Sequence, residues 1–468
     1  MYDLKIVNAR IVDPLNHIDM IGDIAVNDGK VARVAESIDG DAKKNIDATG
    51  KIVIPGIIDM HTHMLTLDGH PHAQRMLAMA GVCTTLDMAG PLDNIIETIS
   101  TSGAGINIAV LEAAKKGRSI SCDNPDRAEQ AALIEKTLDR GGIGVKMMGG
   151  HYPMNLDVAA NFIDEAAKQS AWIGWHAGSA TNGSNIKGMR ECFEASDGKF
   201  LHLAHINSYC RGQVNDVVAE SLEAIELLKA NPHIFCESYV SDLNGTMLTC
   251  VDGVPASKVT IACLKKKGYS ADFHGLCQAI MDGNLGVCHD NGVIGELLYG
   301  KAGVKHLEDN PVCSGSFSVN PAESRFLVAS AKRDDGSFVV DCFSTDGGRY
   351  PRNVIVEVGL SLVKFGAISI QEYVLKSSIN GAKALNLPQK GHLGIGADAD
   401  ITVLDFDRQK AFATIVGGNV VMLDGQLSGK GTTIICDERG VDYLKAKGVQ
   451  YVVKGPLVAE DVAKRLHL

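Results

Sequence analysis

The sequence predicts an α/β protein, a closed (β/α)8 barrel with a small β-sandwich domain formed by both chain ends. After His63, apolar strand-like runs alternate with amphipathic helical segments, which is the pattern of parallel βα units. The two chain ends instead carry short runs with strand and turn signals. Polar side chains follow several of the apolar runs, at the strand ends where barrel enzymes place their reacting groups. These three observations together predict the barrel and its second domain.

The expected domain organisation follows from where the rhythm starts and stops. Residues 1–54 together with 399–468 are expected to form the β-sandwich, and residues 55–398 the barrel, with Pro55-Gly56 as the chain break before it. Between about residues 241 and 339 the rhythm weakens. We therefore expect an insertion there that lids the site.

The elements are expected in regular order along the chain. Strand-like runs cover residues 82–88, 144–148, 172–176, 200–206, 233–240 and 338–343. Helical patterns cover residues 70–79, 127–140, 157–169, 185–195, 217–230 and 370–384. Near the end of the chain, strands are expected at residues 401–404, 413–416 and 419–423, with Gly417-Gly418 as the hairpin turn between the last two.

Composition narrows the class of partner. The 468 residues carry a net charge of -11 and no basic run, which argues against nucleic acid as a partner. No apolar run approaches the roughly 20 residues of a membrane-spanning helix. The 12 cysteines form no CxxC pair, and Met1 is not followed by a charged and then apolar leader. We therefore expect a protein of the reducing cytoplasm.

The apolar run at residues 51–64, KIVIPGIIDMHTHM, ends in two histidines. Because side chains alternate across a strand, His61 and His63 are expected to point the same way. Two imidazoles on one rigid edge can grip a metal ion. This strand end therefore predicts half of a metal site.

Four further polar residues follow apolar strands. They are Lys146 after GIGV, His176 after WIGW, His205 after FLHLA and Asp346 after DCFST. The lysine is unusual, because an ammonium group without a partner is costly to bury. If the barrel is correct, all four side chains lie at the same end as His61.

Two other residues compete for these roles. His202 lies on the same expected strand as His205, and Asp290, in GVCHDNG, competes with Asp346. The pattern leaves both choices open. A set of histidines with one aspartate suits a borderline metal such as zinc, whereas a set of oxygen ligands would suit magnesium or calcium.

The order of these residues resembles the amidohydrolase superfamily, and in particular its dihydroorotase, hydantoinase and D-aminoacylase branches. The resemblance is carried by IVIPGIIDMHTH, AGVCTTLDMAG, GVKMM and ALNLPQKGHLGIGADADITVLD, and it covers nearly the whole chain. It implies that Lys146 is carboxylated and bridges two divalent metal ions, usually zinc. It also implies a ligand set: His61 and His63 with Asp346 for the first ion, and His176 and His205 for the second. Asp346 would in addition be the general base.

Two features depart from the hydantoinase pattern. The interval from His205 to Asp346 is long, and STDGGRYPRN resembles the aspartate loop of D-aminoacylases, which generally lack the bridging lysine. The chain thus combines features of two branches. Both a cyclic amide and an N-acyl amino acid stay open as substrates.

Further residues are candidates for contact with substrate. By resemblance, Tyr152 would steady the tetrahedral intermediate, with His151 beside it at the substrate, although a loop tyrosine that only packs is equally compatible with the pattern. Arg349 and Arg352 can grip a carboxylate through two hydrogen bonds, or can be solvated loop charges or partners of Asp341. Asn207, shortly after His205, can add a hydrogen bond to substrate.

The resemblance implies a metal-dependent amidohydrolase that cleaves an amide C–N bond by metal-activated water. Its substrate would be a small cyclic amide, hydantoin-like or dihydropyrimidine-like, or an N-acyl amino acid. One alternative is a mononuclear deaminase of an amino-substituted ring, and Lys146 counts against it. Another is a catalytically silent dihydropyrimidinase-like scaffold, which would have lost ligands that are all present here. Members of this family mostly form dimers and tetramers, so we expect a homo-oligomer.

Overall fold

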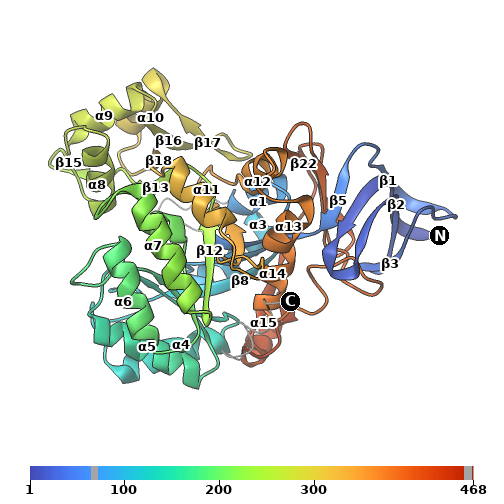
Figure 1. Cartoon of the computed structure of the whole chain (residues 1–468), viewed down its shortest axis with the longest axis horizontal. Coiled ribbons are helices and arrows are strands. Elements are labelled where there is room, and N and C mark those ends of the chain that lie inside the picture. Colours follow the sequence, from blue (N-terminus) through green and yellow to red (C-terminus); the bar gives the residue numbers. More distant parts are fainter. Residues whose placement is uncertain (65–71, 458–465, 467–468) are drawn as a thin grey trace.

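The computed structural model describes residues 1–64, 72–457 and 466, and it has three parts (Figure 1). A barrel of parallel strands lies in the middle, flanked by helices. A sheet built from the two chain ends lies at one side, and a compact insertion lies at the opposite side. The first residues of the expected helix at 70–79 lie outside the described residues.

Parallel strands close the barrel. In order around it they are β6 (Ile57–His63), β7 (Val82–Asp87), β8 (Ala104–Ala113), β9 (Gly144–Met148), β10 (Trp172–His176), β11 (Leu201–Leu203), β12 (Ile234–Tyr239), β19 (Cys342–Ser344) and β20 (Gly347–Gly348). β19 pairs with β12, and β20 pairs with β6. The two short strands are consecutive in the chain, so together they occupy the eighth position of the barrel. The predicted barrel fold is confirmed.

Helices cover the outside of the barrel. They are α1 (Ala73–Met79), α2 (Leu92–Glu97), α3 (Ile99–Ser102), α4 (Arg127–Asp139), α5 (Leu156–Lys168), α6 (Ile186–Ser196), α7 (Val217–Ala230), α11 (Ala322–Ser330), α12 (Ile355–Lys364), α13 (Ile370–Val374) and α14 (Asn380–Ala384). A π-helical turn, Leu375–Ile379, joins the last two into the helix expected at 370–384. The helix starts are locally encoded: Asp126 and Asp216 accept hydrogen bonds from the first backbone N–H groups of α4 and α7.

Several of these elements were not among the expected ones: the strand β8 and the helices α2, α3, α11 and α12. The sequence of β8, AGINIAVLEA, interrupts its apolar residues with Gly105, Asn107 and Glu112 and so hides the strand. Asn107 is nevertheless buried, because its amide donates to Thr84 Oγ1 on β7 and to Asp400 Oδ2. A polar residue with buried partners does not show in a hydrophobicity pattern.

The chain ends form one mixed sheet of nine strands. These are β1 (Tyr2–Asp13), β2 (Ile18–Asn27), β3 (Lys30–Ala35), β4 (Ala42–Asp47), β5 (Ile52–Pro55), β21 (Ile401–Asp405), β22 (Lys410–Val416), β23 (Asn419–Leu423) and β24 (Gln426–Leu427). The two ends meet where β5 pairs antiparallel with β21. Leu4 and Ile24 from the first end share one core with Ile401 and Ile415 from the second. The expected second domain from both chain ends is present, as a single sheet in its strand pairing.

The last described strands lie elsewhere than expected. β25 (Gly431–Cys436) and β26 (Gln450–Val453), joined by α15 (Val441–Ala446), do not pair with the strands of the end sheet. Instead β25 runs parallel to the first half of β8, which is longer than its neighbour β9 and leaves that edge free. The domain boundaries at residues 54 and 399 stay a prediction, and residues 458–465 and 467–468 lie outside the described part.

The insertion is a small unit with its own sheet and core. Its elements are β13 (Leu243–Met247), β14 (Cys250–Val251), β15 (Val254–Pro255), α8 (Lys258–Lys266), α9 (Phe273–Met281), β16 (Leu285–Asp290), β17 (Gly295–Leu298), α10 (Gly300–Asp309) and β18 (Ser314–Ser318). Leu264, Leu276 and Phe317 lie in its core. The next helix, α11, packs against α7 of the barrel. The stretch expected as an insertion therefore also contains one barrel helix.

Within the described residues, no helix is both long and apolar enough to cross a membrane.

Gly144 at the start of β9 gives a test of how tightly the barrel is packed. A Cβ at Gly144 would lie 1.9 Å from the carbonyl oxygen of Trp172 on β10, whereas a Cβ at Gly268 would meet nothing within 4 Å. We expect Gly144→Ala to lower the free energy of unfolding by at least about 3 kcal/mol, the upper end for a single substitution. Gly268→Ala, at φ +83°, should cost only about 1–2 kcal/mol. Thermal melting measures the loss of stability in each variant. Equal melting temperatures for Gly144→Ala and Gly268→Ala would contradict the close packing of β9 against β10.

Candidate metal centre

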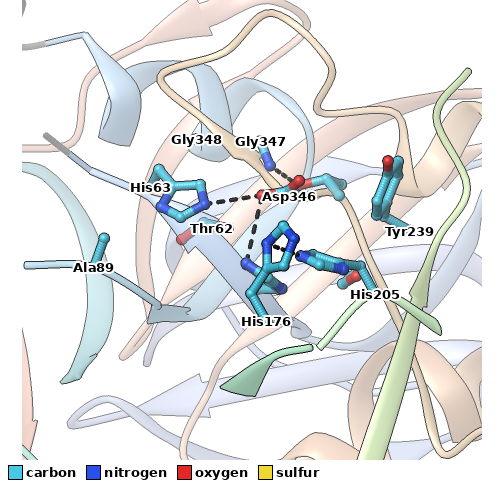
Figure 2. Close-up of polar contacts among 12 residues, drawn as sticks. Thr62, His63, Ala89, His176, His205, Tyr239, Asp346, Gly347 and Gly348 are labelled. Atoms are coloured by element: carbon cyan, nitrogen blue, oxygen red, sulfur yellow. Dashed lines mark hydrogen bonds and ion pairs between the residues drawn. The ribbon is translucent and has the colours of Figure 1, made fainter. Parts of the chain in front are cut away.

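The end of β6 and the residue Asp346 form the first group of side chains that could hold a metal ion. His61 is fully buried, and its ring centroid lies 5.3 Å from that of His63. Oδ1 of Asp346 lies 2.9 Å from Nε2 of His63 and 3.4 Å from Nε2 of His61. One ligand atom from each of the three lies within 4.8 Å of the others, which is close enough for one ion. Figure 2 shows His63 and Asp346 facing each other.

A break in the last barrel strand brings Asp346 to this position. Asp346 lies between β19 and β20 with φ +50°, a left-handed conformation that residues other than glycine seldom adopt. Its backbone N–H donates to the carbonyl of His61 at 2.9 Å. The preceding Thr345 donates its hydroxyl to Oδ2 of the buried Asp59 at 2.6 Å. These bonds hold the break against β6 and direct the carboxylate of Asp346 into the barrel mouth.

Lys146, the third residue of β9, lies beside this group. Its side chain is almost fully buried, and its Nζ lies 3.1 Å from Nε2 of His61. Burial lowers the pKa of Lys146 to about 8, although the negative charges of Asp346 and Glu237 oppose the shift. The unusual lysine of the sequence is thus a buried amine in contact with one of the candidate metal ligands.

His176 and His205 form the second group. Nδ1 of His176 and Nε2 of His205 face each other at 3.1 Å, as Figure 2 shows. The other nitrogens are held by hydroxyls: Nε2 of His176 lies 2.8 Å from Oγ of Ser184, and Nδ1 of His205 lies 2.7 Å from Oγ of Ser208. Burial lowers the pKa of both imidazoles well below the ordinary value. Both rings are therefore neutral and can offer a lone pair to a metal.

The two groups are contiguous and fit metal ions. The rings of His61 and His205 stack with centroids 5.0 Å apart. A tetrahedral ion that binds nitrogen at about 2.0–2.1 Å separates two nitrogen ligands by about 3.3 Å, which is close to the spacing of the His176 and His205 nitrogens. Imidazole nitrogens with one carboxylate form the donor set that zinc prefers.

Glu237, near the end of β12, was missed in the sequence. It is fully buried, and Oε1 accepts hydrogen bonds from Nδ1 of His61 at 2.6 Å and from the backbone N–H of His205 at 2.7 Å. The hydroxyl of Ser344 donates to its Oε2. The only available signal was an acidic residue inside an otherwise uncharged strand, FCESYV, which matches no metal-binding spacing.

The structure also separates the competing residues. His202 lies deeper in the barrel, where Nδ1 accepts from the indole N–H of Trp172 at 3.2 Å and Nε2 lies 3.6 Å from Glu237. Asp290 lies on β16 of the insertion and pairs with His72 at 3.2 Å. Only His205 and Asp346 of the two competing pairs are brought together with the other candidate ligands.

The two arginines occupy different environments. Arg352 is buried and bound to Asp346, with Nη2 at 2.8 Å from Oδ2 and Nε at 2.5 Å from the carbonyl oxygen. It is therefore neither a solvated loop charge nor a partner of Asp341, whose carboxylate accepts from the backbone N–H of Cys236. Arg349 is also buried, its backbone N–H donates to the carbonyl of His63, and burial lowers its pKa to about 10.

The remaining candidates lie around the second group. The ring of His151 is 5.7 Å from that of His176, and Tyr152 follows it, with the ammonium of Lys115 5.3 Å above the tyrosine ring. Asn207 is buried: its Oδ1 accepts from Ser238 at 3.4 Å, and its Nδ2 has no hydrogen-bond partner among the described residues. Their roles toward substrate stay predictions.

The two histidines of β11 should differ in metal binding. His205→Ala is expected to lose bound zinc, because it removes one of the two nitrogens that face each other. His202→Ala should keep the zinc content of the wild type, although its free energy of unfolding should fall by about 1–3 kcal/mol because the buried indole N–H of Trp172 loses its acceptor. Zinc per chain and thermal melting measure the two effects. Loss of zinc in His202→Ala with retention in His205→Ala would reverse the assignment.

Comparisons with known proteins point to one group of hydrolases. The chain is 24% identical over 456 residues to a dihydroorotase of Elusimicrobium minutum, covering 87% of this chain and 89% of that one. It is 25% identical over 437 residues to an L-hydantoinase of Paenarthrobacter aurescens, with 87% and 86% covered. A structure of D-aminoacylase described as having a binuclear metal centre superimposes with a TM-score of 0.64 at 16% identity, covering 93% of this chain and 99% of that one.

The family model agrees with these relatives. The model of the amidohydrolase family matches residues 52–427, which include the end of the first sheet segment, the whole barrel and the return to the end sheet. All the residues of the two candidate groups lie within the match. The chain belongs to the amidohydrolase family, as a metal-dependent amidohydrolase of the dihydroorotase, hydantoinase and D-aminoacylase kind.

Proposed function

We propose that this protein is a binuclear metal-dependent hydrolase that cleaves the amide C–N bond of a small cyclic amide, hydantoin-like or dihydropyrimidine-like, or of an N-acyl amino acid. One observation carries the proposal: the buried amine of Lys146 lies 3.1 Å from His61, whose ring stacks on His205 of the second group. A buried lysine beside two sets of candidate metal-binding side chains has a chemical reason if it bridges two ions.

The bridging role requires a carboxylated lysine. A neutral amine attacks carbon dioxide, forms an N–C bond and loses a proton, and the resulting carbamate offers two oxygens. Burial, which lowers the pKa of Lys146 to about 8, favours the neutral amine that this reaction needs. The first ion would be held by His61, His63 and Asp346, and the second by His176 and His205, with zinc as the metal that the donors suit best.

The reaction follows from the groups at the barrel mouth. Divalent ions bound at these residues would lower the pKa of a water and polarise the amide carbonyl. Arg352 holds Oδ2 of Asp346, and Oδ1 faces His61 and His63. Asp346 would take the proton of the attacking water and pass it to the departing nitrogen. Tyr152 would donate a hydrogen bond to the oxygen of the attacked carbonyl. His151, Asn207 and the buried Arg349 are proposed to contact the rest of the substrate.

Assembly and location belong to the same proposal. We expect a dimer or tetramer that acts on a small molecule in the cytoplasm, as in the expectation from the sequence. Neither nucleic acid nor membrane is needed for this function.

Lys146→Ala tests the bridge, and Lys376→Ala is its matched control. Lys376 is also fully buried, burial also lowers its pKa to about 8, and its Nζ donates to the carbonyl of Val340 rather than to a metal-binding residue. For protein grown with zinc and bicarbonate, we expect about two zinc ions per chain, falling sharply in Lys146→Ala but not in Lys376→Ala. Activity on hydantoins, dihydropyrimidines and N-acyl amino acids should fall in parallel. One ion per chain, unchanged in Lys146→Ala, would instead favour a mononuclear deaminase.

The two arginines should affect different kinetic parameters. If Arg349 binds a substrate carboxylate, Arg349→Met raises KM for N-acyl amino acids about tenfold to a hundredfold, the worth of a charged hydrogen bond, and spares their uncharged amides. Because Arg352 is bound to Asp346, Arg352→Met should lower kcat for charged and uncharged substrates alike. Steady-state kinetics with an N-acyl amino acid and its uncharged amide measure both effects. An equal rise in KM for the two substrates in Arg349→Met would exclude Arg349 as the carboxylate-binding group.

A further inference from the structure

The carboxylate of Glu237 has no part in the reaction proposed above, although it is fully buried in the floor of the metal centre. A buried carboxylate persists only when hydrogen-bond donors or positive charges compensate it. The donors around Glu237 therefore show what it does there.

These donors come from strands that carry the proposed metal ligands. Oε1 accepts from Nδ1 of His61 on β6 at 2.6 Å and from the backbone N–H of His205, directly after β11, at 2.7 Å. The hydroxyl of Ser344, at the end of β19 and two residues before Asp346, donates to Oε2. One side chain on β12 thus joins three other strands of the barrel.

The contact with His61 fixes which nitrogen of the ring carries the proton. An ionised carboxylate can only accept hydrogen bonds, so Nδ1 of His61 carries the hydrogen and Nε2 carries the lone pair. That lone pair faces Nζ of Lys146 at 3.1 Å and Oδ1 of Asp346 at 3.4 Å. Oε1 also accepts from the backbone N–H of His205, which can only donate, so this oxygen acts as an acceptor.

A second feature depends on the same oxygen. His205 adopts φ +37°, a left-handed conformation that strains a residue with a side chain. Its N–H would be buried and unsatisfied without Glu237. The carboxylate thus stabilises the turn that presents Nε2 of His205 toward His176.

We propose that Glu237 is a positioning residue for the metal centre, which holds His61 in the tautomer with a free Nε2 and holds the strained backbone of His205, so that both ion sites are formed before metal binds. This rests on the proposed function, because it requires that the two groups bind metal. Removal of a group that orients a metal ligand typically weakens metal binding about tenfold to a hundredfold.

The first test measures zinc affinity of the metal-depleted protein by competition with a chromophoric chelator. Glu237→Gln keeps the shape of the side chain but removes its charge, and it should bind zinc about tenfold to a hundredfold more weakly than the wild type. The matched control is Glu220→Gln. Glu220 is equally buried, but it accepts only from the backbone N–H groups of residues 212, 214 and 215, at 2.7, 2.7 and 3.0 Å. Glu220→Gln should lower thermal stability and leave zinc affinity unchanged.

The second test requires no metal. In metal-free protein labelled with ¹⁵N-histidine, a proton on Nδ1 bonded to a carboxylate should give a downfield correlation that is absent in His61→Ala. We expect this signal in the wild type and its shift upfield in Glu237→Gln. If Glu237→Gln does not fold, Ser344→Ala, which removes only the donor to Oε2, should still weaken zinc binding several-fold.

The outcomes separate this inference from the proposed function. A wild type that binds no zinc refutes the metal centre itself. A wild type that binds zinc, with a Glu237→Gln variant of equal affinity, refutes only the positioning role. A histidine signal that places the proton on Nε2 of His61 refutes it as well.

Discussion

Burial of charge at the barrel mouth is the constraint on which the rest of this structure depends. Lys146, His61 and Glu237 are shielded from water almost completely, and Asp346 and Arg352 nearly so. A buried charge without a partner costs more free energy than a domain can spare, so each of these groups needs a partner of fitting charge or hydrogen-bonding capacity. The broken last strand satisfies this need, because it brings Asp346 to the histidines at the end of β6 and Arg352 to Asp346.

The insertion is joined to this network through its stem. Arg352 donates to the carbonyl of Leu243, the first residue of β13, at 3.0 Å while it holds Asp346. Arg211 donates to the hydroxyl of Tyr239 at the end of β12 and to the side chains of Asn244 and Asn320 at the two ends of the insertion. The position of the insertion and the position of the Asp346 carboxylate therefore both depend on Arg352, so sequence changes in this unit can reach the site without touching substrate.

The end sheet is attached in a similar way at another point of the barrel. Asp400, just before β21, accepts from Nζ of Lys390 at 2.6 Å and from the amide of Asn107 on β8 at 2.9 Å. Its other oxygen accepts from the backbone N–H of Gly417 in the turn before β23. A single buried carboxylate thus connects a barrel strand with the hairpin of the second sheet. The same barrel strand, β8, also pairs with β25 along its free edge.

Local pattern was sufficient for much of the fold and part of the site. Alternation of apolar runs and helical segments predicted the barrel, because periodicity and capping act over a few residues and leave a mark in the sequence. His61 and His63, and the polar residues after four other strands, could be predicted because parallel strands place their ends at one edge.

The sequence by itself thus determined the fold class, the strands that carry the candidate ligands and the residues at their ends. Only the tertiary structure decided that His205 and Asp346, rather than His202 and Asp290, lie beside the other candidate ligands. It alone also decided that Arg352 binds Asp346 and that Glu237 binds His61 across 176 residues of chain. Contacts of this kind depend on how distant strands and loops pack. No local period or spacing records that packing, so an isolated polar residue in a strand has no visible partner until the chain is folded.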